Sequence, residues 1–315
     1  MLLFLAVVAI LLVLPLLLIT LHALMVPTTR AGLMLRSLAL IGFCGLLVLA
    51  GMWAFPPWWT PYVLVALALL ASFNAWRRLR GGSRAPGMTR RWGELAVSAA
   101  VLVVVGAGAL AVTQGRQVPP DAVDIAFPLE PGRYLVVNGG HHALLNLHFM
   151  TLDDPQYADY RGQSFAVDMI AVDRFGFRAR NPLGADDPAD YHIFGAEVRA
   201  PCDGTVIGAE SEMVDHTVPE RDTERLAGNH LLIDCGDFIV LLAHLRQGSL
   251  EVGLGDTVTT GARLAEVGNS GQSGEPHLHV HAQRGTDPDA ALSGAPLPVT
   301  FDGRFPVRNA RLRGD

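Results

Sequence analysis

The chain has 315 residues, of which 50% are hydrophobic and only 17% are charged, so it is too apolar to be an entirely soluble protein. Its formal net charge of −6 argues against a nucleic-acid partner, because phosphate binding requires a basic surface. All 24 basic residues are arginine. The sequence therefore excludes mechanisms that need a lysine, such as Schiff-base chemistry or a P-loop.

Apolar residues dominate the N-terminal part of the chain and predict four transmembrane helices over residues 1–113. A helix crosses about 30 Å of hydrocarbon with about 20 apolar residues. The first segment has no basic n-region and no clear cleavage site, which favours a retained helix over a signal peptide. The spans contain no Asp, Glu or Lys, so anchoring is favoured over transport or sensing. The four segments are Leu2–Met25, Ser37–Phe55, Tyr62–Trp76 and Leu95–Thr113.

Arginines in the loops between these segments predict the orientation. The second loop, Phe55–Pro61, has no charge, whereas the first and third loops are basic. Positively charged loops stay in the cytoplasm, so both chain ends are expected outside, in the periplasm or facing the cell wall. The arginines are Arg30 and Arg36 in the first loop and Arg77, Arg78, Arg80, Arg84, Arg90 and Arg91 in the third.

The rest of the chain predicts an all-β domain. Residues 114–132 contain four prolines and are expected to form an extended linker. Residues 133–297 form the expected domain and residues 298–315 a peripheral polar tail. Short β-rich runs separated by Gly, Asp and Asn predict antiparallel strands around one core. These runs are Tyr134–Val137, Ser164–Val172, Glu197–Ala200, Thr205–Ala209, His230–Asp234, Phe238–His244, Thr257–Val258, Arg263–Val267 and His277–Ala282.

The three cysteines do not form a CxxC motif, so a cysteine-based zinc site is not expected. Cys44 lies in an apolar segment and is interpreted as a small buried hydrophobic residue. Cys202 and Cys235 lie in the expected β domain. An extracytoplasmic domain permits a disulfide between them, and two reduced core thiols are the alternative.

Several histidines and one aspartate have the pattern of a metal site. His277, His279 and His281 alternate along a predicted strand, so their imidazoles share one face. Imidazole nitrogen is a preferred zinc ligand. His244 ends an apolar strand, and Asp168 lies inside another, where an isolated carboxylate is strongly disfavoured without a cation or donor.

These residues lie in motifs that resemble the lysostaphin/LytM family of zinc endopeptidases. In family order the chain has A-P-C-D-G-T-V from Ala200, then G-N-H-L-L-I-D, A-H-L, V-G-L-G-D-T-V and G-N-S-G-Q-S-G-E-P-H-L-H, over about 150 residues. The resemblance implies an antiparallel, barrel-sandwich-hybrid-like fold of duplicated hairpins and a Zn²⁺ cofactor. It also implies that Asp168 and His279 are zinc ligands, and that His244 and His277 flank the zinc-bound water as catalytic residues.

The position of the first ligand departs from the family pattern. Many members have a histidine four residues before the aspartate, where this chain has Ser164. His148, in the sequence N-L-H, is the preferred replacement and resembles a subgroup with an N-x-H element at this place. His141 and His142 are the alternatives, and a degenerate site is a third reading.

The expected function is hydrolysis of peptide bonds in peptidoglycan cross-links or stem peptides, by a domain anchored in the membrane lipid bilayer. A regulatory membrane partner remains unidentified. The alternative is a non-catalytic wall-binding or regulatory module, since some proteins of this fold have lost their ligands. His281 is interpreted either as a group behind the ligands or as an ordinary strand residue. His230 is expected to line its strand.

Overall fold

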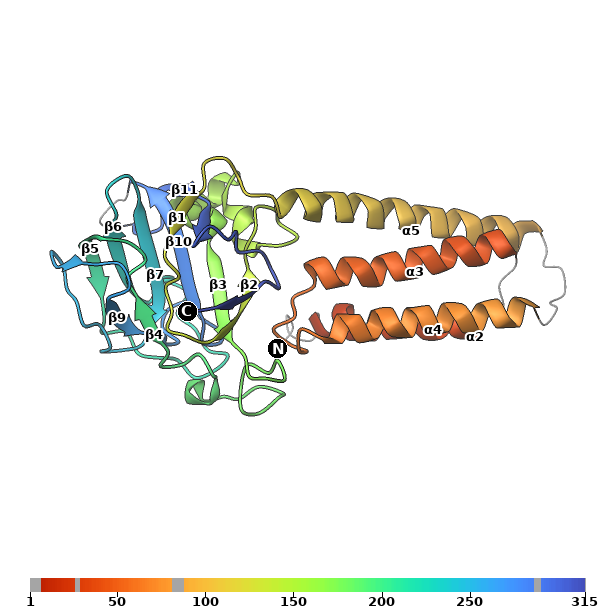
Figure 1. The fold of residues 1–315 in the computed structure, drawn as a ribbon, viewed down its shortest axis with the longest axis horizontal. Coiled ribbons are helices and arrows are strands. Elements are labelled where there is room, and N and C mark those ends of the chain that lie inside the picture. The colour runs from red at the N-terminus through yellow and green to blue at the C-terminus, as the bar shows by residue number, and fades with distance from the viewer. Residues whose placement is uncertain (1–6, 26–28, 81–87, 286–289, 315) are drawn as a thin grey trace. The chain divides into compact units, whose positions relative to one another are not determined.

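The computed structural model describes residues 7–25, 29–80, 88–285 and 290–314. The chain divides into two compact units, Met1–Gln114 and Gly115–Asp315. The first unit is helical and the second is built mainly of strands (Figure 1). Arg84 of the predicted third loop, and residues 2–6 of the first predicted span, lie outside the described residues.

Three helices of the first unit are long and apolar enough to cross a membrane, judged by length and composition. The apolar helix over Ala9–Leu24 is shorter, so a fourth crossing remains a prediction. Thr29 caps the first long helix by accepting a hydrogen bond from Gly32 N at 2.9 Å. The helices are η1 (Ala9–Val13, a π-helix), α2 (Leu14–Leu24), α3 (Arg30–Ala50), α4 (Thr60–Arg80) and α5 (Met88–Gly115).

Helix α5 begins at Met88, earlier than the predicted span over Leu95–Thr113. Glu94 therefore lies inside the helix and pairs with Arg36 of α3 at 3.6 Å. The predicted span has no acidic residue, but the observed helix does, because the helical hydrogen bonds continue through the polar turns that precede the apolar run.

The second unit contains short strands and 3₁₀ helices. The expected antiparallel β domain is confirmed, and all nine predicted runs contain a strand. The 3₁₀ helices are η2 (Leu147–Thr151), η3 (Pro155–Phe165) and η4 (Pro188–Asp190). The strands are β1 (Val123–Ile125), β2 (Arg133–Asn138), β3 (Val167–Ala171), β4 (Glu197–Arg199), β5 (Gly204–Glu210), β6 (Asn229–Asp234), β7 (Ile239–Leu245), β8 (Thr257–Val258), β9 (Arg263–Glu266), β10 (Leu278–Arg284), β11 (Ala295–Leu297), β12 (Val299–Phe301) and β13 (Arg311–Arg313).

The main sheet has the strand order β13-β2-β3-β10-β7-β6-β5-β8, and β11 pairs with β10 beside this path. Its paired strands are antiparallel, so alternate residues point to opposite faces. One face carries the hydrophobic core, with fully buried residues such as Met169, Leu242 and Leu278. The other face carries Asp168 and His279, which are the chain neighbours of Met169 and Leu278.

Both segments that flank the expected domain contribute strands to it. The expected linker, residues 114–132, contains β1, and the expected tail, residues 298–315, contains β12 and β13. β1 and β12 form a parallel pair, while β13 extends the main sheet beside β2. These strands have only three residues each, and such short runs carry too little hydrophobic alternation to be recognised in sequence.

Cys202 and Cys235 form a disulfide, which resolves the two alternatives left by the sequence. The bridge connects the turn before β5 to the turn after β6. Cys44 is free and buried within the helical unit, as expected.

Candidate metal centre

The candidate site begins as one row of residues across the main sheet. Asn138 of β2 lies opposite Asp168 of β3, and Asp168 lies opposite His279 of β10. Beyond the site, the same sheet register continues through Ala243 of β7 to His230 of β6. Directly opposed residues of antiparallel strands point to the same face. Sheet pairing therefore brings Asp168 and His279 together, although 111 positions separate them in sequence.

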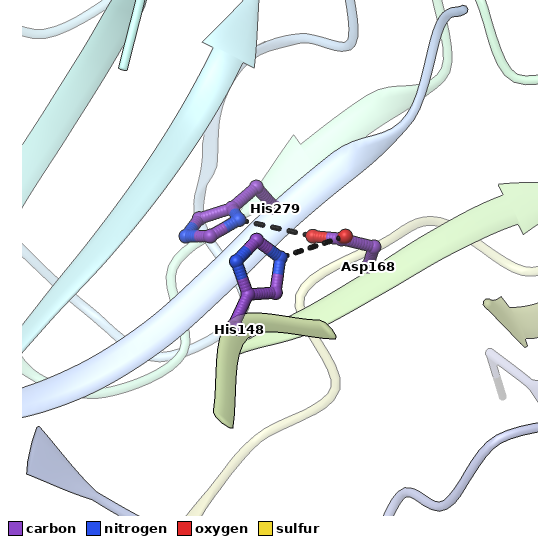
Figure 2. Close-up of side chains that lie close together, drawn as sticks. All are labelled: His148, Asp168 and His279. Atoms are coloured by element: carbon purple, nitrogen blue, oxygen red, sulfur yellow. Dashed lines mark hydrogen bonds and ion pairs between the residues drawn. The ribbon is translucent and has the colours of Figure 1, made fainter. Parts of the chain in front are cut away.

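The carboxylate of Asp168 is buried and has an imidazole on each oxygen. His148 Nε2 lies 2.9 Å from Oδ2, and His279 Nδ1 lies 2.9 Å from Oδ1. Figure 2 shows the two rings directed at this carboxylate. His148 comes from η2, outside the sheet, and Asn146 starts that helix by accepting a hydrogen bond from His148 N at 3.1 Å. The three side chains therefore come from three elements: the 3₁₀ helix η2 and the strands β3 and β10.

Charge balance at this cluster favours an ionised carboxylate. Burial alone raises the pKa of Asp168, but the adjacent imidazoles and their hydrogen bonds hold it well below its usual range. Burial likewise opposes the charged form of His148, yet the Asp168 carboxylate outweighs it and raises the pKa of His148. For His279 burial dominates and lowers the pKa. The cluster therefore holds an ionised carboxylate that the neighbouring imidazoles stabilise.

The donor set fits a zinc ion. His148, Asp168 and His279 each offer one ligand atom, and these atoms lie within 4.8 Å of one another. Two imidazole nitrogens with one carboxylate oxygen is a common ligand set of catalytic zinc, which keeps a further position open for water or substrate. Two of the rings that border the cluster remain accessible, since 21% of the His148 side chain and 18% of the His277 side chain are exposed. Solvent can therefore reach the site from their side.

His244 is placed beside the cluster by an irregularity in the sheet. On β6 Asn229 and His230 are consecutive, but their partners on β7 are Leu245 and Ala243, so His244 is the extra residue of a β-bulge. Its φ of 62° lies in the left-handed region, which costs a non-glycine residue about 1–2 kcal/mol. The bulge turns the imidazole toward His277, with ring centroids 4.6 Å apart.

Main-chain carbonyls determine the tautomers of both flanking histidines. His244 Nδ1 lies 2.9 Å from the Ser270 carbonyl oxygen, and His277 Nδ1 lies 2.8 Å from that of Glu275. A carbonyl oxygen only accepts, so both Nδ1 atoms carry hydrogen, and in the neutral form of each ring the lone pair lies on Nε2. Burial, followed by the neighbouring imidazoles, lowers the pKa of His244 well below its usual value. His244 is therefore a neutral base at neutral pH.

The alternative first ligands lie away from the carboxylate. His141 packs against Phe305, and His142 stacks on Phe149. Among the described residues, the group that can hold a metal includes His148 and neither of these two. The Asn-x-His spacing suits this role because the asparagine caps the 3₁₀ turn that carries the histidine.

Ser164, at the family position of the first ligand, supports that same turn. Its hydroxyl is buried and lies 2.8 Å from Thr151 Oγ1. Thr151 in turn donates to the carbonyl oxygen of His148 at 2.8 Å. A residue that the sequence offered only as a poor ligand thus supports the turn that carries His148, the predicted replacement.

Two residues that sequence reasoning missed hold Asp168 from behind. Asn138 donates its amide nitrogen to Asp168 Oδ2 at 2.7 Å. Arg308 donates to Asn138 Oδ1 at 2.9 Å and to the carbonyl oxygens of Val137 and Leu144. A buried arginine cannot be recognised in a polar C-terminal segment without the fold, because its partners lie more than 160 positions away.

Residues 189–290 match the model of Peptidase family M23. The C-terminal unit contains an M23 peptidase domain. The matched residues include His244, His277 and His279, whereas His148 and Asp168 precede them. The M23 match and the candidate metal group therefore overlap at His279.

Solved structures similar to this chain include M23-type peptidases. A zinc-containing peptidase from Vibrio cholerae is 18% identical over 60% of this chain and 39% of its own, with a TM-score of 0.29. The lysostaphin catalytic domain from Staphylococcus simulans is 19% identical over 32% of this chain and 74% of its own, with a TM-score of 0.23. A solution structure of lysostaphin is 19% identical over 40% and 39%, with a TM-score of 0.25.

The chain thus spans about two fifths of the length of two of these three proteins. A search of the curated proteins finds no match. The assignment of the domain rests on the M23 family match.

Proposed function

We propose that the M23 domain is a zinc-dependent endopeptidase that hydrolyses peptide bonds in peptidoglycan cross-links or stem peptides. The observation that carries the proposal is the pairing of His148, Asp168 and His279 with two further imidazoles, those of His244 and His277, beside them. A metal-binding module without catalysis needs the first three side chains only. The two flanking imidazoles add the proton-transfer groups that hydrolysis requires.

His148, Asp168 and His279 would hold the ion, with Asp168 supplying the negative charge. Bound zinc would supply a Lewis acid that polarises the peptide carbonyl and lowers the pKa of water toward about 7. The chain's own contribution is to keep these ligands buried and aligned while one side stays open to solvent.

His244 and His277 would divide two tasks between them: transfer of the proton and stabilisation of the oxyanion. Each has a basic Nε2, because its Nδ1–H is engaged by a main-chain carbonyl. One imidazole would take the proton of the attacking water and deliver it to the leaving amine. The other, in its form protonated at Nε2, would donate a hydrogen bond to the oxyanion that develops on the carbonyl oxygen.

The proposed substrate requires that the domain lie outside the cytoplasm, anchored by the bilayer. The basic loops between the apolar helices support this orientation. The Cys202–Cys235 disulfide supports it independently, since disulfides persist in oxidising compartments and are rare in the cytosol. A reporter fused after residue 315 tests the orientation, and cytoplasmic activity of that reporter would contradict the cell-wall role.

The deciding experiment measures zinc content and peptidoglycan cleavage of the detergent-solubilised full-length chain. We expect one zinc per chain, together with release of new amino termini from purified peptidoglycan, lost after chelation and restored by Zn²⁺. Zinc without cleavage would favour a wall-binding module over an enzyme. Absence of zinc after reconstitution would contradict the metal site itself.

A further inference from the structure

A chain of buried hydrogen bonds leads away from His279 on the side opposite Asp168. His279 Nε2 lies 3.0 Å from His281 Nδ1, and His281 Nε2 lies 3.2 Å from Gln283 Oε1. Gln283 Nε2 then lies 3.0 Å from the carbonyl oxygen of Ala291. The three side chains alternate along β10 and therefore share a face. His281 and Gln283 are fully buried, so water does not compete for these bonds.

The last bond determines the direction of all the others. The Ala291 carbonyl oxygen only accepts, so the amide nitrogen of Gln283 faces it and Oε1 faces His281. Oε1 also only accepts, so His281 carries its hydrogen on Nε2. In a neutral imidazole the other nitrogen is then an acceptor. His281 Nδ1 must therefore receive the hydrogen of His279 Nε2, so the lone pair of His279 lies on Nδ1 once a metal ion replaces the hydrogen bond from Nδ1 to Asp168 Oδ1.

We infer that His281 and Gln283 are positioning residues that hold His279 in its metal-binding tautomer. Nδ1 is the atom that faces Asp168, and its lone pair is what a metal ion requires. Histidines that bind metals commonly donate their second ring N–H to a carboxylate or main-chain carbonyl. Here a neutral imidazole accepts it, and a glutamine two residues further along the strand keeps that imidazole in the accepting form.

Gly162 of η3 leaves space for the Gln283 side chain, the last member of this series of hydrogen bonds. A Cβ at this position would collide with Gln283 Oε1 and would meet the Leu292 carbonyl oxygen at 2.6 Å. Gly162 N also donates to that carbonyl at 2.7 Å. Because η3 is held this close to Gln283, Gly162→Ala would displace the side-chain amide of Gln283 while both histidines, His279 and His281, stay in the sequence.

The inference rests on the proposed function, because it assigns His279 to zinc. The test is the zinc dissociation constant of the detergent-solubilised full-length chain, measured by competition with a chromophoric chelator. His281→Leu removes the acceptor and should weaken zinc binding about 10- to 100-fold. His281→Asn keeps an amide oxygen near the Nδ1 position and should stay within about threefold of wild type. Gln283→Leu and Gly162→Ala should fall between these two variants.

A purely structural role would produce a different pattern. His281→Leu and His281→Asn would then lower the melting temperature of the metal-free protein and change zinc binding equally. His230→Leu is the matched control, since His230 is a half-buried strand imidazole whose Nδ1 bonds the Gly228 carbonyl and not the cluster. Its zinc affinity should equal that of wild type.

The outcomes separate the two claims. Wild-type zinc binding with peptidoglycan cleavage, combined with unchanged affinity in His281→Leu, would overturn the positioning role and leave the proposed function intact. Equal loss in the Leu and Asn variants would also overturn it. A wild-type chain that binds no zinc would overturn both.

Discussion

The two halves of the candidate metal centre use buried imidazoles in opposite ways. In the ligand half, His148 and His279 direct ring nitrogens at the Asp168 carboxylate. In the flanking half, His244 and His277 donate Nδ1–H to main-chain carbonyls, so Nε2 is the ring nitrogen that these carbonyls leave unengaged. Burial alone does not distinguish the halves, since His244 and His279 are both almost inaccessible. The role of each histidine follows from the partner of its second nitrogen.

The largest expected effect comes from the centre of the ligand half. Asp168→Ala removes the only carboxylate of the ligand group and should abolish both zinc binding and hydrolysis. Asp168→Asn, which keeps the shape and loses the charge, should also lose zinc. Metal analysis and a cleavage assay on the same samples check this. Hydrolysis that survives in Asp168→Ala would remove Asp168 from the site.

The next effect decides which histidine completes the ligand half. His148→Ala should lose the zinc ion, because no other imidazole of the described group faces Asp168 Oδ2. His141→Ala and His142→Ala are the matched controls and should keep one zinc per chain. Zinc retained in His148→Ala and lost in a control would transfer the ligand role to that control residue.

The comparison between halves is sharpest at His244. His244→Ala should leave zinc affinity near that of wild type while turnover falls about 10²- to 10⁴-fold, because it removes a proton-transfer or oxyanion group and no ligand. The split between zinc content and rate is the measurement. Loss of zinc in His244→Ala would place His244 in the ligand half and erase the distinction.

The smallest effect is expected behind the carboxylate. Arg308→Met breaks the contact to Asn138 and loosens the hydrogen bond to Asp168, which should weaken zinc binding by about tenfold. Arg313→Met, at an exposed position of the same segment, is the control and should bind zinc like wild type. Equal affinities in the two variants would reduce Arg308 to a role in packing the C-terminal segment.

Much of the fold was predictable because its signals are local. Alternation of hydrophobic residues and turn residues located the longer strands, and runs of apolar residues located the long helices. The predicted and observed strands near Asp168 and His279 agree within a few residues. The short strands β1, β12 and β13 were not predictable, because three residues establish no period, and they form only when distant partners are present.

Some of the candidate ligands were likewise predictable from local sequence, and others needed the tertiary structure. His277 and His279 belong to one short motif, and Asp168 is conspicuous because a carboxylate inside an apolar strand needs a partner. The choice among His148, His141 and His142 could not be made from spacing alone. It depends on where a 3₁₀ turn lies relative to β3, which is a tertiary relation.

The sequence by itself thus determined the long apolar helices, the antiparallel β domain and the residue types of a candidate metal site, since each rests on composition or on a local repeat. Only the tertiary structure decided that Cys202 meets Cys235 and that Arg308 reaches Asn138 from the far end of the chain. It also decided the hydrogen-bond direction through His281 and Gln283, because that direction originates at the Ala291 carbonyl. Hydrogen bonds select partners by position in space, which sequence separation does not encode.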